Sequence, residues 1–337
     1  MQSRRRLSMA IAMAMAWVAL LAMVLVQPTP AAAGRPLRAV MISPYGKGVP
    51  FDSLAYQGLE DAAEKHGLQV KLVEARDQSE YESQIQAMAE LGYDIVFALH
   101  DYFAEPMKAV APLYPGTTFI LIDSQVDGGL PNMLSVAMEP QEGCYLAGIA
   151  AAHATQSKKV GFIGGLDHPI IIQFLAGFEA GLHSVDPEID ISVAFSGVFD
   201  DPVKGREMAL AMIDRGADVI MHAADFTGVG VLKAAAERGV WGVGVDLDQS
   251  DVAPGHVLAS ALKDARGAVR AAVQMVVEGT FEPGVMIYGL EQGADLVAIP
   301  ADLSFYREHP EVLAAIERAQ EEIKAGIIVV PKTTKTR

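Results

Sequence analysis

The chain has 337 residues, with 42 acidic side chains against 26 basic ones and a formal net charge of −16. Such an acidic surface repels nucleic acid and anionic lipid headgroups, so neither is expected as a partner. The only cysteine, Cys144, excludes an intramolecular disulfide, and no CxxC, HExxH or His-rich pattern indicates a zinc site. We therefore expect packing alone to stabilise the fold, with no metal or cofactor and with Cys144 buried on a helix.

Residues 1–33 are typical of an export signal. Three arginines at 4–6 precede an uninterrupted apolar run from Met9 to Val26, prolines end it, and Ala31-Ala32-Ala33 offers a cleavage site. No cysteine stands at that site, so there is no lipobox. The alternative is an uncleaved anchor, because 18 apolar residues are just long enough to span a bilayer. Cleavage by the Sec pathway would leave 304 residues, remove three arginines and no acids, and lower the net charge to −19, which predicts a periplasmic protein.

Buried strands and amphipathic helices alternate along the first half of the remaining chain. Strands are predicted at 38–43, 69–75, 94–99 and 117–123, with a helix at 52–66. Ser79 and Glu82 form a predicted capping box that opens a second helix. Strands that are apolar on both faces and joined by crossover helices form a parallel sheet covered on both sides.

The same rhythm restarts after a helix predicted at 141–154. The later strands are predicted at 159–164, 189–195, 218–222 and 240–246, and the later helices at 171–182, 203–215 and 229–237. Two successive arrays of this kind predict two doubly wound α/β lobes, each with its own core.

Ligands bind outside the carboxyl ends of the strands in such sheets, so the residues after each predicted strand are the candidates. Carboxylates there accept hydroxyl hydrogens, aromatic rings stack on a flat ligand, and glycines permit close backbone approach. For any single acid, the cap of the next helix is the alternative interpretation. These strand-end residues are Ser43, His100, Asp101, Asp123, Gly165, Phe199, Asp246 and the segment 223–227.

Several blocks, in order along the chain, resemble the basic membrane protein (Bmp) family of ABC-transporter substrate-binding proteins. The best-known members are purine nucleoside receptor lipoproteins. The blocks are CYLAGIAAA from Cys144, VGFIGG from Val160, SGVFDDPVKG from Ser196, GADVI from Gly216, TGVG from Thr227, VGVDLDQ from Val243 and SALK from Ser260. The resemblance spans about 40–297. It implies a type I periplasmic binding fold with two lobes joined by hinge strands: 34–137 plus 263–290, and 138–262 plus 291–330.

The resemblance also implies a binding site. Phe51 and Phe199 would stack on the two faces of a purine, Asp246 would accept from ribose hydroxyls, and Lys263 would donate to one of them while keeping Asp246 ionised. Further ligand-binding positions implied or suggested are Ser43, Asp52, His100, Asp123, Asp225 and Gly228. The resemblance is incomplete at three positions: Ser43 stands where the family has aspartate, Asp52 where it has asparagine, and Asp225 is an added carboxylate. The residues expected to contact the base therefore differ from the family pattern. His100 and His222 lie at two more strand ends, and either is equally well interpreted as a hydrogen-bonded wall residue.

These features predict a monomeric periplasmic solute-binding protein of an ABC importer. It would capture a purine nucleoside or related purine between two closing lobes and be recognised by a permease in the inner membrane. One alternative is a binder of a free purine base or another flat heterocycle that serves a sensor receptor. A secreted nucleoside-cleaving enzyme is disfavoured, because no Gly-x-Ser-x-Gly elbow occurs and no Gly-x-Gly-x-x-Gly follows the first strand.

Overall fold

The computed structural model describes residues 35–300 and 302–334, so the predicted export signal lies outside the described residues. Leu37–Arg337 forms one compact unit. Within the described ranges, no helix combines the length and apolar character needed to cross a membrane.

The strands of the described chain form two six-stranded sheets. In the first, called sheet A here, the order is β11-β5-β4-β3-β1-β2 and every neighbouring pair is parallel. Its central strands are buried on both faces, which explains why they appear in the sequence as continuous apolar runs. The strands are β1 (Arg38–Ser43), β2 (Gln69–Glu74), β3 (Ile95–Leu99), β4 (Thr118–Ile122), β5 (Met133–Met138) and β11 (Gly284–Tyr288).

The second sheet, sheet B, has the order β12-β10-β9-β8-β6-β7. Its pairs are parallel except for the short edge strand β12, which runs antiparallel to β10. The strands are β6 (Lys159–Gly164), β7 (Asp190–Phe195), β8 (Val219–Ala223), β9 (Trp241–Asp246), β10 (Val257–Leu262) and β12 (Val297–Ala298).

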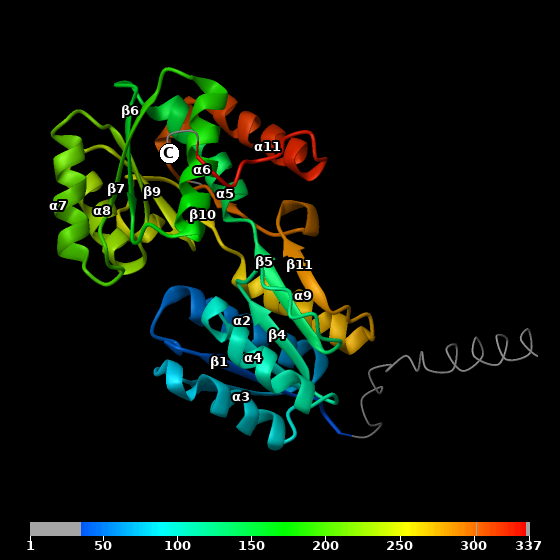
Figure 1. Cartoon of the computed structure of the whole chain (residues 1–337). Coiled ribbons are helices and arrows are strands. Elements are labelled where there is room, and N and C mark those ends of the chain that lie inside the picture. Colours follow the sequence, from blue (N-terminus) through cyan, green and yellow to red (C-terminus); the bar gives the residue numbers. More distant parts are fainter. Residues whose placement is uncertain (1–34, 301, 335–337) are drawn as a thin grey trace, which may run out of the picture. The chain divides into compact units, whose positions relative to one another are not determined.

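Helices cover both faces of each sheet (Figure 1). Alternate residues of β1 and β3 pack against α2 and α9 on one face and against α3 and α4 on the other, as the period of two in a strand requires. In sheet B, α5 and α6 cover one face and α7 and α8 the other. The helices are α2 (Pro50–His66), α3 (Tyr81–Glu90), α4 (Ala104–Val110), α5 (Pro140–Ala154), α6 (Pro169–Val185), α7 (Pro202–Ile213), α8 (Asp225–Arg238), α9 (Ala265–Glu278), α10 (Ser304–Glu308) and α11 (Pro310–Lys324).

Glycines let α5 and α6 approach closely enough to form one layer. A Cβ at Gly177 would lie 2.1 Å from the carbonyl oxygen of Gln141, and one at Gly181 would lie 2.1 Å from that of Tyr145. Any larger residue would push the two helices apart. Cys144 lies in this layer, fully buried and unpaired, and burial raises the pKa of its thiol well above the usual value. The prediction of a buried cysteine on a helix is confirmed.

Within the described residues, the chain passes between the two sheets three times. The passages run from β5 to α5, from β10 to α9, and from β11 to β12. Two hydrogen bonds tie them together: Leu290 N–H donates to Glu142 Oε2 at 2.8 Å, and the Tyr288 hydroxyl donates to Asp264 Oδ2 at 3.2 Å. Two doubly wound α/β lobes joined by connecting segments are therefore confirmed.

Two local predictions were wrong. The capping box is replaced by Asp77, whose carboxylate accepts from Ser79 N–H at 2.9 Å and opens a short 3-10 turn ahead of α3. Ser79 lies inside this turn, two residues before α3 begins at Tyr81, so it cannot cap that helix. The helix predicted from 229 begins at Asp225, so the glycine-containing segment after β8 is its first turn and not a loop.

Candidate functional site

The strand order places a switch point in each sheet. In sheet A, β1 lies between β3 and β2, and in sheet B, β6 lies between β8 and β7. The two strands that follow β1 in the chain, β2 and β3, lie on opposite sides of it, and β7 and β8 lie on opposite sides of β6 in the same way. The chain connections therefore diverge at β1 and at β6, which opens space at the carboxyl ends of these strands. Ser43 is the last residue of β1, His100 and Asp123 follow β3 and β4, Asp225 lies two residues after β8, and Asp246 ends β9.

The backbone is strained at four of these strand ends. Among the described residues, five that are not glycine have positive φ, and four of them are His100 (72°), Asp123 (65°), Asp225 (45°) and Asp246 (67°). A side chain in this region costs about 1–3 kcal/mol, and such strain concentrates at functional sites. Four polar side chains are thus held at positions where glycine would be less costly.

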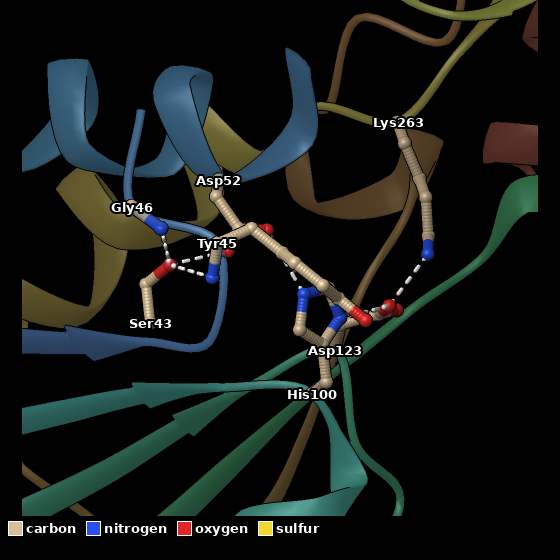
Figure 2. Close-up of polar contacts among 7 residues, drawn as sticks. All are labelled: Ser43, Tyr45, Gly46, Asp52, His100, Asp123 and Lys263. Carbon is tan, nitrogen blue, oxygen red and sulfur yellow. Dashed lines mark hydrogen bonds and ion pairs between the residues drawn. The ribbon is translucent and has the colours of Figure 1, made fainter. Parts of the chain in front are cut away.

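Ser43 and Asp52 form a buried pair at the end of β1. The Ser43 hydroxyl donates to Asp52 Oδ2 at 2.5 Å and accepts from the backbone N–H of Tyr45 and of Gly46, at 3.1 and 2.7 Å (Figure 2). Neither residue is exposed to solvent. Ser43 therefore fixes the turn that follows β1 and one oxygen of Asp52, which leaves that oxygen little capacity for another partner.

His100 lies between two carboxylates (Figure 2). Its Nε2 donates to Asp52 Oδ1 at 2.9 Å, and its Nδ1 lies 3.8 Å from Asp123 Oδ2. Burial alone would lower the pKa of His100, but Asp123 and Asp52 together outweigh it and raise the pKa to about 9. The imidazole is therefore a buried cation at neutral pH.

Lys263 completes this set from the segment between β10 and α9. Its Nζ donates to Asp123 Oδ2 at 2.6 Å, and both side chains are largely buried. Burial alone would raise the pKa of Asp123, but the charges of Lys263 and His100 bring it well below the usual range. We refer to Asp52, His100, Asp123 and Lys263 as the ion network. It contains two acids and two cations, and each charge has an opposite partner.

Phe51 packs against the ion network at the start of α2. The Lys263 ammonium lies 4.7 Å from the centre of its ring, and the His100 ring lies 5.3 Å away at an angle of 38°. The ring is almost entirely buried. A stacked heterocycle would therefore share Phe51 with the Lys263 cation, which favours an electron-rich ring.

Lys263 acts on Asp246 in the expected direction, but its ammonium is paired with a different acid. The two residues are joined through the backbone, Lys263 N–H to the Asp246 carbonyl at 3.1 Å, but the Lys263 ammonium bonds Asp123. Burial raises the pKa of Asp246, and the opposing effect of the Lys263 charge is smaller. The side chain of Lys263 points to an acid of the other sheet because that acid is the nearer partner.

Two residues outside the predicted set, Gln249 and His222, hold the loop that carries Asp246. Gln249 Oε1 accepts from Val245 N–H at 2.9 Å and from His222 Nε2 at 2.8 Å, while the Ser260 hydroxyl accepts from Gln249 N–H at 3.1 Å. His222 is fully buried, which lowers its pKa to about 4 despite the bond to Gln249. It is neutral at pH 7, and Gln249 engages its Nε2. The VGVDLDQ block contained Gln249, but nothing local in the sequence pairs it with His222.

Asp225 and Gly228 lie in the first turn of α8. Burial, together with the charges of Asp246 and Asp52, raises the pKa of Asp225 to about 6. Asp225 and Asp246 have no ion-pair partner within the described residues, and we call them the carboxylate pair. Gly228 is buried against His222, because a Cβ at Gly228 would lie 1.8 Å from His222 Nδ1. The structure thus gives this glycine a packing reason that is independent of any ligand.

Phe199 lies in the loop after β7, partly exposed, with its ring against Gly165, where a Cβ would lie 2.1 Å from the ring. The Phe199 carbonyl accepts from Thr227 N–H at 3.1 Å, and Asp201 N–H donates to the Thr227 hydroxyl at 3.0 Å. The loop is therefore anchored to the first turn of α8, near the carboxylate pair.

The predicted residues thus fall into two linked groups. Direct contacts join Phe51 and Ser43 to the ion network, whereas Phe199, Gly228 and the carboxylate pair lie at the ends of the sheet B strands. Within the described residues, no three His, Cys, Asp or Glu side chains are grouped so that they could hold a metal ion. A separate cavity of about 370 Å³ between α2 and α9 is lined by ion-paired and polar surface residues and includes none of the predicted ones.

The chain was compared with known families. The model of the Bmp family, described as PnrA-like ABC transporter substrate-binding proteins, matches residues 39–334. The chain belongs to the Bmp family. Members of this class are substrate-binding proteins of ABC transporters, which bind small molecules outside the cytoplasm for a transporter permease.

Two curated relatives match most of this Bmp-family chain. The ABC transporter nucleoside-binding protein BmpA of Lactococcus lactis subsp. cremoris (strain MG1363) is 29% identical over 304 residues, which are 83% of this chain and 84% of the relative. Basic membrane protein A2 of Borrelia garinii subsp. bavariensis is 31% identical over 305 residues, 88% of this chain and 89% of the relative.

Solved structures agree with this assignment. An ABC transporter solute-binding protein from Aeropyrum pernix K1 superposes with a TM-score of 0.74 at 27% identity, covering 88% of this chain and 94% of that one. One from Conexibacter woesei DSM 14684 gives 0.72 at 21% identity, covering 88% and 99%, and supports the fold alone. The predicted type I periplasmic binding fold is confirmed.

Proposed function

We propose that this Bmp-family protein is the periplasmic receptor of an ABC importer and captures a purine nucleoside or related purine. The observation that supports the proposal is that Lys263 links two different groups of strand-end side chains, through Asp123 and through the carbonyl of Asp246. One group offers a buried aromatic ring beside fixed cations, and the other offers free carboxylate acceptors. A nucleoside has the matching halves, an electron-rich base and a hydroxylated sugar. The nucleoside-binding protein BmpA of Lactococcus lactis, at 29% identity, supports the same class.

In this proposal the base stacks on Phe51 and Phe199, and Asp246 accepts from the ribose hydroxyls. Asp52 has both oxygens engaged, by Ser43 and His100, so its role is to hold His100 in place. Each aromatic contact is worth about 1 kcal/mol beyond burial. The ion network forms one wall of the proposed site. Its two cations, His100 and Lys263, face the ligand from that wall.

Transport requires two forms that a permease can distinguish. We propose that the two lobes, 34–137 plus 263–290 and 138–262 plus 291–330, close on the ligand, because the ligand gains contacts with both groups only in the closed form. The lobes are connected by the three passages between the sheets. The protein would act as a monomer, and cleavage of the signal would give a mature amino terminus at Gly34.

The proposal is tested first by mass spectrometry of small molecules released from the purified, denatured protein, which should identify a purine nucleoside. Calorimetry with the identified ligand then tests Asp246→Ala. Loss of a charged acceptor should weaken binding by about 1.5–3 kcal/mol, which is tenfold or more. Asp248→Ala is the control, because Asp248 is exposed in the same loop and caps only Ser250 N–H, at 2.9 Å.

Equal affinities of Asp246→Ala and the parent protein would contradict the proposed site. An enzymatic role is tested by incubating the protein with nucleosides and measuring free base. Release of free base in amounts well above the protein concentration would contradict a purely binding function.

A further inference from the structure

The two groups of strand-end residues differ in net charge. The ion network is neutral as a whole, because His100 and Lys263 balance Asp52 and Asp123 through contacts of 2.6–3.8 Å. The carboxylate pair, Asp225 and Asp246, adds two negative charges without an ion-pair partner among the described residues. The site as a whole therefore carries a charge of about −2 when both acids are ionised.

Asp225 also changes what the amino terminus of α8 can bind. The amino terminus of a helix of this length attracts anions, because its free N–H groups and dipole favour negative charge. Here the carboxylate at the first helical position takes that place, and the Phe226 N–H lies toward it and opposes the rise in its pKa. A phosphate approaching this terminus would meet a carboxylate instead of free N–H groups.

Charged groups from three other elements act on Asp225. Asp246 from β9 and Asp52 from α2 disfavour its ionisation, and His100 after β3 favours it. Asp246 ends β9, and Asp225 lies two residues past β8, the parallel neighbour of β9, so Asp225 lies on the side where Asp246 is proposed to hold the sugar. The part of a nucleoside that responds to Asp225 is therefore the ribose and its 5′ substituent.

We propose that Asp225 sets the charge preference of this site: the carboxylate pair favours ligands with a cationic or donor-rich group on the sugar side and rejects phosphorylated ligands. This inference rests on the proposed function and deepens it, because it names the substrate class by charge. Asp225 is then a specificity-determining residue. The backbone of Asp225 is held at φ 45°, a conformation that is costly for a residue with a side chain.

The test uses three ligands that share the same base and ribose: adenosine, 5′-amino-5′-deoxyadenosine and adenosine 5′-monophosphate. Affinities are measured by calorimetry with the full-length mature protein at pH 7.5. We expect the cationic amine to bind at least tenfold more tightly than adenosine, and the monophosphate at least a hundredfold more weakly. Asp225→Asn should reduce the preference for the amine over adenosine to below threefold, whereas Asp248→Asn should leave it unchanged.

A pH series separates charge from shape. Because the pKa of Asp225 is raised to about 6, the preference for the amine should decline between pH 7.5 and 5.0 in the parent protein and stay constant in Asp225→Asn. If adenosine binds and the three affinities are equal, or if Asp225→Asn retains the preference, the inference is overturned while the proposed function stands. If none of the three binds, the inference fails, and the proposed function stands only if another purine is released from the purified, denatured protein.

Discussion

The strand ends of sheet A and of sheet B solve the problem of buried charge in opposite ways. In sheet A the ion network satisfies each charge internally, and the Asp123–Lys263 contact of 2.6 Å extends it to the passage between the sheets. In sheet B the carboxylate pair has no such partner, and burial raises the pKa of both acids. Sheet A thus presents a preorganised wall, and sheet B presents acceptors that a ligand can satisfy.

This difference predicts that removing a charged side chain changes stability with opposite signs in the ion network and in the carboxylate pair. Breaking a buried ion pair leaves an uncompensated charge and destabilises the fold, whereas removing one of two repelling carboxylates relieves a cost. The same carboxylates should be costly for stability and useful for binding, a trade-off typical of functional sites.

The largest effect is expected for His100→Leu. The change leaves Asp52 fully buried without its cationic partner and should lower the free energy of unfolding by about 3–5 kcal/mol. Denaturant unfolding followed by circular dichroism measures it. His168→Leu at an exposed position is the control, and equal midpoints for the two variants would contradict the ion network.

The second effect is a dependence of stability on pH. A histidine whose pKa is raised from about 6.5 to about 9 stabilises the fold fully below pH 6.5, and this stabilisation is lost as the pH rises through 9. The expected loss between pH 6.5 and 9 is about 3 kcal/mol. Unfolding measured across this range should show it in the parent protein and not in His100→Asn; identical profiles would disprove a charged His100.

A smaller effect is expected for Gln249→Ala in sheet B. Here the buried groups are neutral, and the change removes the acceptor of Val245 N–H and of His222. Each unsatisfied group costs about 1–3 kcal/mol, so unfolding should become easier by that order. Unlike His100→Leu, this variant should keep the pH dependence between 6.5 and 9. Gln274→Ala, at an exposed position, is the matched control.

The smallest effect, and the one of opposite sign, is expected for Asp225→Asn. An acid whose pKa is raised from about 3.9 to about 6 destabilises the fold above pH 6, and the fold regains that stability as the pH falls from 6 to 4. Asn should therefore stabilise the protein by about 1–2 kcal/mol at pH 7.5 and by nothing at pH 4. Thermal unfolding at both pH values measures this, and destabilisation at pH 7.5 would show that Asp225 is already satisfied.

Much of the fold could be predicted from local patterns. The parallel sheets follow from apolar runs such as 38–43 and 159–164, whose burial on both faces is written directly into the sequence. The strand β5 and the elements from β10 onward were not predicted, although Gly128-Gly129 and Pro254-Gly255 mark turns ahead of β5 and β10. Asp225 was placed in a loop, because its glycine-rich neighbourhood disguises the first turn of α8.

The candidate residues could be gathered from the sequence, but their partners could not. From the sequence we expected Lys263 to act on Asp246, and the two residues are indeed joined by a backbone hydrogen bond. The Lys263 ammonium, however, bonds Asp123, which lies 140 residues away in the sequence. Which of two acids a long side chain reaches depends on the separation of strand ends in space, and no local pattern encodes that distance. The role of Gln249 was missed for the same reason.

By itself, the sequence determined the class of fold, the family and the set of polar residues at the strand ends, because apolar periodicity and chain order are local properties. Only the tertiary structure decided which of those residues are neutralised and which remain free acceptors. The physical reason is that the energy of a charge depends on burial and on its nearest opposite charge. Burial and the nearest opposite charge both depend on residues such as Asp52, His100 and Lys263. These residues lie far apart in the sequence and meet only after the chain has folded.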